Sequence, residues 1–247
     1  MVTGKSFAPV AVPKAADVLA ADIRERILSG ELPEGSMLPP ERELVEQTGL
    51  SRATVREALR ILQVERLLRI RPGRGGGAFV HCPDHASLAG AVELVIRGQR
   101  LRLDALHETR EAVEPACAAL AATRRTEDDL GQLDVAHEEL TSASDVPGFL
   151  RGNVRWHTAV ARASGNELLI GLMTALADAI YDATDIEHFL DDDIRRVTAR
   201  AHARVTDAIR ARDEAGARRR MERHVCAFAR AAARVDRRVG LELDGRG

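Results

Sequence analysis

The fold of the first part of the chain is decided by residues 41–59, which read Glu41-Arg42-Glu43-Leu44-Val45-Glu46-Gln47-Thr48-Gly49-Leu50-Ser51-Arg52-Ala53-Thr54-Val55-Arg56-Glu57-Ala58-Leu59. Glu41 opens a predicted short helix, Gly49-Leu50-Ser51 predicts a tight turn, and Arg52 opens a second helix. Ser51 is a good N-cap, because its hydroxyl can accept a backbone N–H of the following turn. An Arg/Gly-rich hairpin then runs to Val80. The stretch predicts a helix-turn-helix with a β-wing, which lays one helix in the DNA major groove.

The positive charge of the chain is concentrated on this motif. Residues 50–80 hold seven Arg and two Glu, a balance of +5, whereas the whole chain carries a formal charge of −2. On the second helix, Val55, Leu59 and Leu62 recur at helical spacing and can face a core, so the arginines fall largely on other faces. Arginine suits two-pronged contacts to guanine or phosphate. A charge run is often an ordinary solvated face, but here it coincides with helix, turn and wing, which favours DNA as the partner.

Composition disfavours two other kinds of nucleotide site. Aromatic residues make up 3% of the chain and only Phe79 lies in the basic region, whereas single-stranded nucleic acid is usually stacked on aromatic rings. The glycines of residues 73–77 lack both the spacing of a dinucleotide-binding loop and a following helix. Double-stranded DNA is therefore the expected partner.

These residues resemble the GntR family of bacterial transcription regulators. The resemblance rests on Gly35-Ser36-Met37-Leu38-Pro39, Glu41-Arg42-Glu43-Leu44, the second helix from Ser51 to Leu59, and Gly73-Arg74-Gly75 followed by Phe79-Val80. It implies that four residues contact the operator, and it places a helix hydroxyl where it can meet phosphate. By position the contact residues are Arg42, Arg52, Arg56 and Gly73, and the hydroxyl is that of Thr54.

The chain departs from the family pattern at two positions. Pro40 stands where such helices often carry a Ser cap, although proline is acceptable near the first turn of a helix. Arg66 stands where a Gly usually ends the second helix. If Arg66 adopts the left-handed conformation, the strain is on the order of 1 kcal/mol.

The sequence predicts two domains with loose ends, and the fold class is mostly α. We expect a flexible arm at residues 1–13, the winged helix-turn-helix with its small β-wing at 14–81, an all-α helical bundle for effector binding and dimerisation at 82–240, and a tail at 241–247. The boundary falls near His81-Cys82-Pro83-Asp84, beyond which strand signals vanish. Pro115 should kink the second helix of the bundle. Helical periodicity predicts bundle helices at roughly 86–98, 103–123, 126–142, 148–164, 167–188, 192–211 and 213–237, with breaks at Pro147-Gly148, Ser164-Gly165-Asn166 and Arg212-Asp213.

The cysteines and the apolar segments indicate where in the cell the protein is expected. Cys82, Cys117 and Cys226 are few, odd in number and widely spaced, which fits a reducing cytoplasm and forms no zinc-ribbon pattern. No apolar run approaches the roughly 18 residues of a membrane-spanning helix. We expect a cytoplasmic protein without a membrane anchor.

Three histidines of the bundle can converge. Asn153 and His157 are four residues apart and share one helix face. His202 and His224 lie about equally far from the predicted turn at Arg212-Asp213, so an antiparallel hairpin brings them to one level. Three imidazole nitrogens suit zinc or a similar divalent ion with open positions. The alternative is that each His is an ordinary hydrogen-bonded residue.

The bundle also resembles the effector domain (FCD domain) of the fatty-acid-regulator subgroup of GntR proteins. The matching stretches are Arg110-Glu111-Ala112-Val113-Glu114-Pro115, Trp156-His157 with Ser164-Gly165-Asn166, and His202 through Asp213 to His224. In many members an Asp and three His hold a divalent metal, zinc or nickel among the candidates. The resemblance implies His157, His202 and His224 as ligands and places Asn153 at the Asp position. It implies that Arg110 faces the cavity, where it can clamp a carboxylate effector. A surface salt bridge with Glu114 is the competing interpretation of Arg110.

We expect a ligand-responsive, homodimeric transcription regulator that binds a pseudo-palindromic operator, as a repressor, with a small carboxylate as effector. A metal-responsive regulator is the nearest alternative. A metallohydrolase is disfavoured because no carboxylate is placed by motif beside the histidines and no H-E-x-x-H occurs. An architectural DNA-binding protein would have a solid, metal-free bundle.

Overall fold

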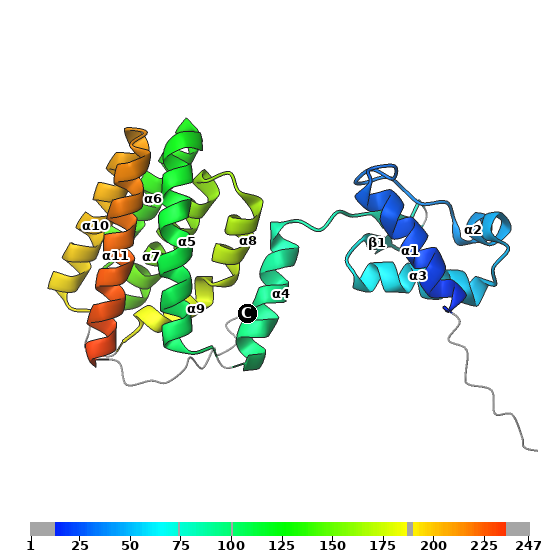
Figure 1. Ribbon diagram of the computed structural model, residues 1–247, viewed down its shortest axis with the longest axis horizontal. Helices are drawn as coiled ribbons and strands as arrows, with labels where there is room; N and C mark the ends of the chain where they lie inside the picture. Colours follow the sequence, from blue (N-terminus) through cyan, green and yellow to red (C-terminus); the bar gives the residue numbers. More distant parts are fainter. Residues whose placement is uncertain (1–12, 74, 100, 187–189, 236–247) are drawn as a thin grey trace, which may run out of the picture. The chain divides into compact units, whose positions relative to one another are not determined.

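The chain folds into two compact units. The structure is a computed structural model and describes residues 13–73, 75–99, 101–186 and 190–235 (Figure 1). The two units divide between Pro83 and Asp84, and each has its own hydrophobic core. The predicted arm, apart from Pro13, and the predicted tail lie outside the described residues.

The first unit is the predicted winged helix-turn-helix. Its elements are α1 (Ala15–Leu28), α2 (Glu41–Thr48), α3 (Arg52–Val64), β1 (Leu68–Arg71) and β2 (Gly77–Val80). The two strands are antiparallel, with Leu68 opposite Val80 and Arg71 opposite Gly77. α1 packs against α3 and contributes Leu19, Ile23 and Ile27 to the core. This packing holds α3 from behind and leaves its opposite face open.

Local signals set the ends of these helices as predicted. The Ser51 hydroxyl accepts the backbone N–H of Thr54 at 3.1 Å and caps α3. Val55, Leu59 and Leu62 are buried. Pro40 precedes α2 without a side-chain cap. Arg66 has a φ of 61°, so the left-handed conformation and its strain, on the order of 1 kcal/mol, are present in this chain.

The wing tip has three positions that favour glycine. Gly73 and Gly75 have φ values of 97° and 83°, in the left-handed region that favours glycine. Gly76 has an ordinary φ, but a Cβ there would collide with the carbonyl oxygen of Arg71. The glycines therefore shape the wing tip rather than a phosphate-binding loop.

The second unit is the predicted all-α bundle. Its helices match the expected ranges within one or two residues at most ends, and no helix among the described residues is long and apolar enough to cross a membrane. They are α4 (His85–Gln99), α5 (Leu103–Arg124), α6 (Glu127–Ser142), α7 (Val146–Ala163), α8 (Glu167–Ala175), α9 (Ala177–Thr184), α10 (Asp192–Arg210) and α11 (Glu214–Val235).

Two predicted features of the bundle were wrong. The single helix expected at 167–188 is two helices, α8 and α9, joined at Leu176, and residues 187–188 lie outside the described residues. The break expected at Pro147-Gly148 falls earlier, because Asp145 caps α7 through the N–H of Gly148 and Pro147 occupies the first turn. α5 continues through Pro115, where the bend was expected.

Helix α5 runs through the middle of the bundle. It packs against α7, α10 and α11, while α6 covers α7 and α10, and α4 lies beside α8 (Figure 1). Trp156 of α7 is fully buried in the core, with Leu106 of α5 and Ile209 of α10. The face of α7 that carries Asn153 and His157 is thereby directed toward α5, α10 and α11.

Gly152 sets how closely α7 approaches α6. A Cβ at this position would lie 2.7 Å from the backbone nitrogen and Cα of Leu140, closer than real Cβ atoms approach backbone. Any larger residue must push α7 outward. Because Asn153 follows directly and His157 comes little more than one turn later, Gly152 also sets the depth of these side chains.

We expect Gly152→Ala to destabilise the bundle by about 1–3 kcal/mol, because the added methyl group forces two packed helices apart. Denaturant unfolding followed by the fluorescence of Trp156, the one tryptophan of the chain, measures this. Gly131→Ala on α6 is the control. A Cβ there meets nothing within 4 Å, so helix propensity alone should stabilise by about 0.5–1 kcal/mol. Equal stability of the Gly152→Ala variant and the wild type would contradict the close approach.

Candidate functional site

The exposed face of α3 carries the side chains expected to meet DNA. Arg52 and Arg56 lie on the first turns of α3 and are exposed, while Val55 between them is fully buried. Arg42 is exposed on α2. Thr54 is half-buried, and its hydroxyl lies 2.8 Å from that of Ser51. The fold therefore presents Arg52 and Arg56 to solvent from one rigid helix.

Two of these arginines are already held by carboxylates. Arg56 pairs with Glu41 of α2 at 2.7 Å, and Arg42 pairs with Glu46 one turn along α2 at 3.0 Å. Both pairs are exposed, so each contributes little to stability. These ion pairs hold the guanidinium groups of Arg42 and Arg56 at the surface of α2 and α3 in the protein without DNA.

The wing adds a second basic element. Gly73 lies in its loop, and the guanidinium group of Arg71 stacks 4.5 Å above the ring of Phe79. Phe79 thus packs within the wing, with the cation of Arg71 over one face of its ring.

In the bundle, the three histidines converge as the sequence predicts. The Nε2 atom of His224 lies 3.1 Å from the Nε2 atom of His202 and 3.4 Å from that of His157. The rings of His157, His202 and His224 come from α7, α10 and α11, respectively. All their ligand atoms lie within 4.8 Å of one another.

The spacing of the three nitrogens fits a divalent ion. Nitrogen ligands at 2.0–2.1 Å around a tetrahedral ion are separated by about 3.3–3.4 Å. The two Nε2 separations in the cluster are close to that value. The donor set, three neutral imidazoles, is one that zinc and nickel accept.

A buried ion pair orients His157. Arg110 and Glu114 of α5 pair at 2.6 Å, and both side chains are almost fully buried. The second carboxylate oxygen of Glu114 contacts Nδ1 of His157, and Arg110 lies 3.3 Å from Nε2 of the same ring. An ionised Glu114 requires the proton on Nδ1, so the lone pair of Nε2 points toward Arg110 and the other rings.

The electrostatics keep the carboxylate charged and the rings neutral. Burial raises the pKa of Glu114, but the Arg110 guanidinium and the His157 ring outweigh it and hold that pKa well below its usual range. Burial lowers the pKa of His157 and lowers that of His202 further, with the other histidines adding to the effect on His202. Burial also lowers the pKa of His224 to about 3. Neutral imidazoles keep their lone pairs free for a metal.

Stacking on Trp156 positions His202. The two rings are nearly parallel, with centroids 3.8 Å apart, and the indole N–H donates to the hydroxyl of Thr206 at 3.1 Å. Nδ1 of His202 is buried and has no hydrogen-bond partner among the residues that the structure describes. The ring is thus held by packing, and its inward nitrogen is directed at His224.

Asn153 lies where the resemblance puts it, on α7 and buried. Together with Arg110, His157 and His224 it lines a cavity of about 10 Å³. Such a space holds about one water molecule. An effector larger than this does not fit in this cavity in this arrangement.

The sequence analysis missed Glu114 as a site residue. The expected alternatives for Arg110 were a surface salt bridge with Glu114 or a cavity-facing clamp, whereas the pair is buried and Arg110 also lines the cavity. No sequence motif places a carboxylate beside the histidines, yet Glu114 contacts His157 in the structure. The available signal was a lone Glu before Pro115 in an otherwise apolar stretch of α5.

Comparisons with known proteins agree with both units. The family described as "Bacterial regulatory proteins, gntR family" matches residues 15–79, and the FCD domain matches residues 105–227. The Galactonate operon transcriptional repressor of Escherichia coli (strain K12) is 31% identical over 207 residues, 80% of this chain and 87% of that protein. The Putative L-lactate dehydrogenase operon regulatory protein of the same strain is 33% identical over 219 residues, 85% and 83% of the two chains.

A solved structure shares the fold. The chain titled "Streptococcus agalactiae GntR" has a TM-score of 0.64 and 28% identity, over 87% of this chain and 99% of that one. Relatives are named as transcriptional repressors and regulators, and none of those described here is an enzyme. On the residues matched in both units, this chain belongs to the GntR family of bacterial DNA-binding transcription regulators, with an FCD domain as its second unit.

Proposed function

We propose that the protein is a homodimeric repressor that binds a pseudo-palindromic operator and responds to a small carboxylate at a divalent metal in the bundle. The observation that carries the effector half of this proposal is the convergence of the three histidine Nε2 atoms. The DNA half rests on the capped helix α3 with its exposed arginines. We therefore also propose a cytoplasmic location, because that is where operator DNA lies in a bacterium.

The charge of the site favours an anionic effector. Arg110 and Glu114 cancel one another, and the three imidazoles and Asn153 are neutral. A divalent ion held by His157, His202 and His224, with Asn153 beside them, would supply an uncompensated double positive charge. A buried charge without a partner is costly, so an anion that approaches it is bound strongly.

The relatives support a carboxylate as that anion. The two described above are named for galactonate and L-lactate dehydrogenase operons, and galactonate and lactate each carry a carboxylate. Arg110 lines the cavity and can offer a remaining N–H to such a group. A response to the metal alone is the second candidate, and the cavity of about 10 Å³ favours it, because an ion fits there without rearrangement.

Dimerisation has a candidate surface on the second unit. Leu94 and Val95 of α4 and Leu168 of α8 are exposed, and these two helices pack side by side. Large exposed apolar side chains on neighbouring helices are typical of a protein interface. A two-fold dimer presents two α3 helices to two half-sites, and an effector that prefers one arrangement of the dimer shifts DNA affinity by about 1–3 kcal/mol.

Arg52→Ala and Arg56→Ala should each weaken operator binding by about 1–3 kcal/mol if the side chain contacts a base. Fluorescence anisotropy with a duplex selected from a random-sequence pool measures the affinity. Arg26→Ala on α1 is the control, since that arginine pairs with Asp22 and Glu31 within the domain. Unchanged affinity in both α3 variants would remove α3 as the recognition helix.

His202→Ala should abolish metal retention, because it removes one of three converging nitrogens. Elemental analysis of untagged protein, purified without chelator and supplied with zinc or nickel, should find about one ion per wild-type chain. His107→Gln on α5, outside the cluster, is the control and should keep the ion. Because Trp156 stacks on His202, nickel should also quench wild-type fluorescence. Full metal content in the His202→Ala variant contradicts the ligand set.

Asn153→Asp should tighten metal binding by about tenfold, or about 1.4 kcal/mol, because a carboxylate replaces a neutral amide beside the ion. Competition with a fluorescent zinc chelator measures the affinity. Asn166→Asp is the control, since Asn166 only caps α8 and Asp caps equally well. If both variants bind zinc as the wild type does, Asn153 is not a ligand.

A further inference from the structure

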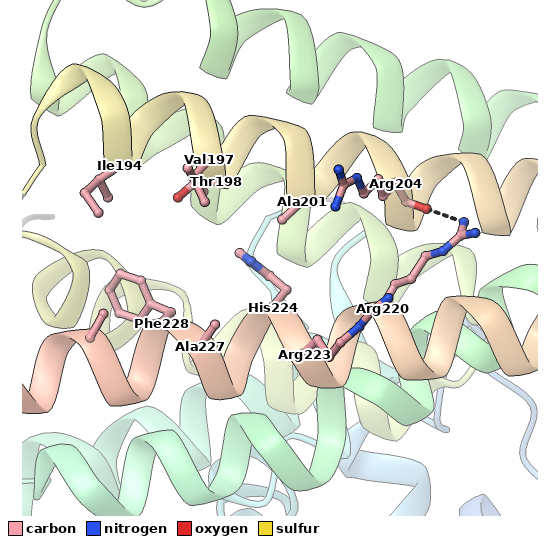
Figure 2. Close-up of a pocket in the computed structure, with 11 residues that line it drawn as sticks. Ile194, Val197, Thr198, Ala201, Arg204, Arg220, Arg223, His224, Ala227 and Phe228 are labelled. Atoms are coloured by element: carbon pink, nitrogen blue, oxygen red, sulfur yellow. Dashed lines mark hydrogen bonds between the residues drawn. The ribbon is translucent and has the colours of Figure 1, made fainter.

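A groove between α10 and α11 lies outside the histidine cluster. Its volume is about 250 Å³, far more than the inner cavity offers. Figure 2 shows its two helical walls, with His224 between them at mid-length. His224 is the one histidine of the cluster among its lining residues.

One end of the groove is cationic. Arg204 of α10 and Arg220 and Arg223 of α11 gather there (Figure 2). None of the three forms an ion pair within the described parts of the chain. Arg220 donates to the backbone oxygen of Arg204 at 2.8 Å and so links the two helices, while Arg204 and Arg223 are exposed. Because these three positive charges pair with no carboxylate of the described residues, they create a local positive potential.

The other end is apolar. Ile194 and Val197 of α10 face Phe228 of α11 across the groove (Figure 2), and Val197 is 55% exposed. Between the two ends, the walls carry the small side chains of Ala201 and Ala227 beside the His224 ring. These small residues leave room for a ligand to lie lengthwise over His224.

We propose that this groove binds an anionic amphipathic small molecule. Its carboxylate or sulfonate head lies between Arg204 and Arg223, and its apolar body runs over Ala201 and Ala227 toward Val197 and Phe228. Charge complementarity selects an anion, and the separation of cationic and apolar ends selects an elongated amphipath over a compact polar acid. The site goes beyond the metal-centred effector site and does not require a metal.

The test uses the full chain, treated with chelator, and a fluorescent probe that is displaced by competitors. Decanoate and decanol are the main competitors, because they have the same chain length and differ in charge. We expect 8-anilinonaphthalene-1-sulfonate to bind with enhanced fluorescence and to be displaced by decanoate at least tenfold more effectively than by decanol or acetate. Equal displacement by decanol would mean that the arginines do not take part, and this result overturns the proposal.

Matched variants locate the probe. Arg204→Gln with Arg223→Gln should weaken decanoate binding tenfold or more, whereas Arg200→Gln with Arg218→Gln, exposed on the same helices outside the groove, should leave it unchanged. Ala227→Leu, at an exposed position, should fill the groove and abolish binding without unfolding. Wild-type affinity in the groove variants, or equal losses in the control pair, contradicts the site.

Two further measurements separate this inference from the proposed function. His202→Ala without metal should still bind decanoate, so that failure of the metal site leaves this prediction intact. Light scattering of the Ala227→Leu variant should report the wild-type mass. A changed mass would mean that a second copy of the chain covers the groove, which overturns the proposal.

Discussion

The buried pair of Arg110 and Glu114 is the interaction on which the bundle site depends. Moving two charges out of water costs several kcal/mol, and a buried pair gives little net stability even at 2.6 Å. Its effect is orientation. One oxygen of Glu114 holds Arg110 and the other holds Nδ1 of His157, so a single carboxylate fixes a guanidinium group and the tautomer of an imidazole. Without Glu114, no carboxylate would hold the proton on Nδ1 of His157, and the lone pair on Nε2 would no longer be kept directed toward the other two rings.

The remaining constraints transmit this orientation between helices. Gly152 lets α7 lie close to α6, and Trp156 fixes the ring plane of His202 on α10 by stacking. The hairpin of α10 and α11 places His224 opposite. Each histidine is therefore positioned by a different kind of contact, an ion pair, a stacked ring or a helix register, and the cluster forms where the three meet.

The sequence predicted what local chemistry decides. Ser51 and Gly49 mark the turn between α2 and α3, and nearly equal distances from the turn at Arg212-Asp213 bring His202 and His224 to one level. The contact of Glu114 with His157 was not predicted, because the two residues are 43 positions apart and no local sequence pattern indicates such a contact. The break between α8 and α9 at Leu176 was not predicted, because neither glycine nor proline marks it in the sequence. Cavity size depends on side-chain packing throughout the bundle, which no spacing rule reports.

The carboxylates beside Arg42 and Arg56, the arginines that we propose to meet DNA, would have a consequence for selectivity. Glu41 pairs with Arg56 and Glu46 pairs with Arg42, so both carboxylates would compete with DNA phosphate for these arginines. On random DNA, an arginine that leaves its carboxylate for a phosphate exchanges one anion for another and gains little. If the proposed operator contact is to a guanine edge, that edge would add two directed hydrogen bonds to the exchange. The acidic neighbours would thus weaken non-specific DNA binding more than operator binding. The ratio of specific to non-specific affinity, which governs operator occupancy in the cell, would rise.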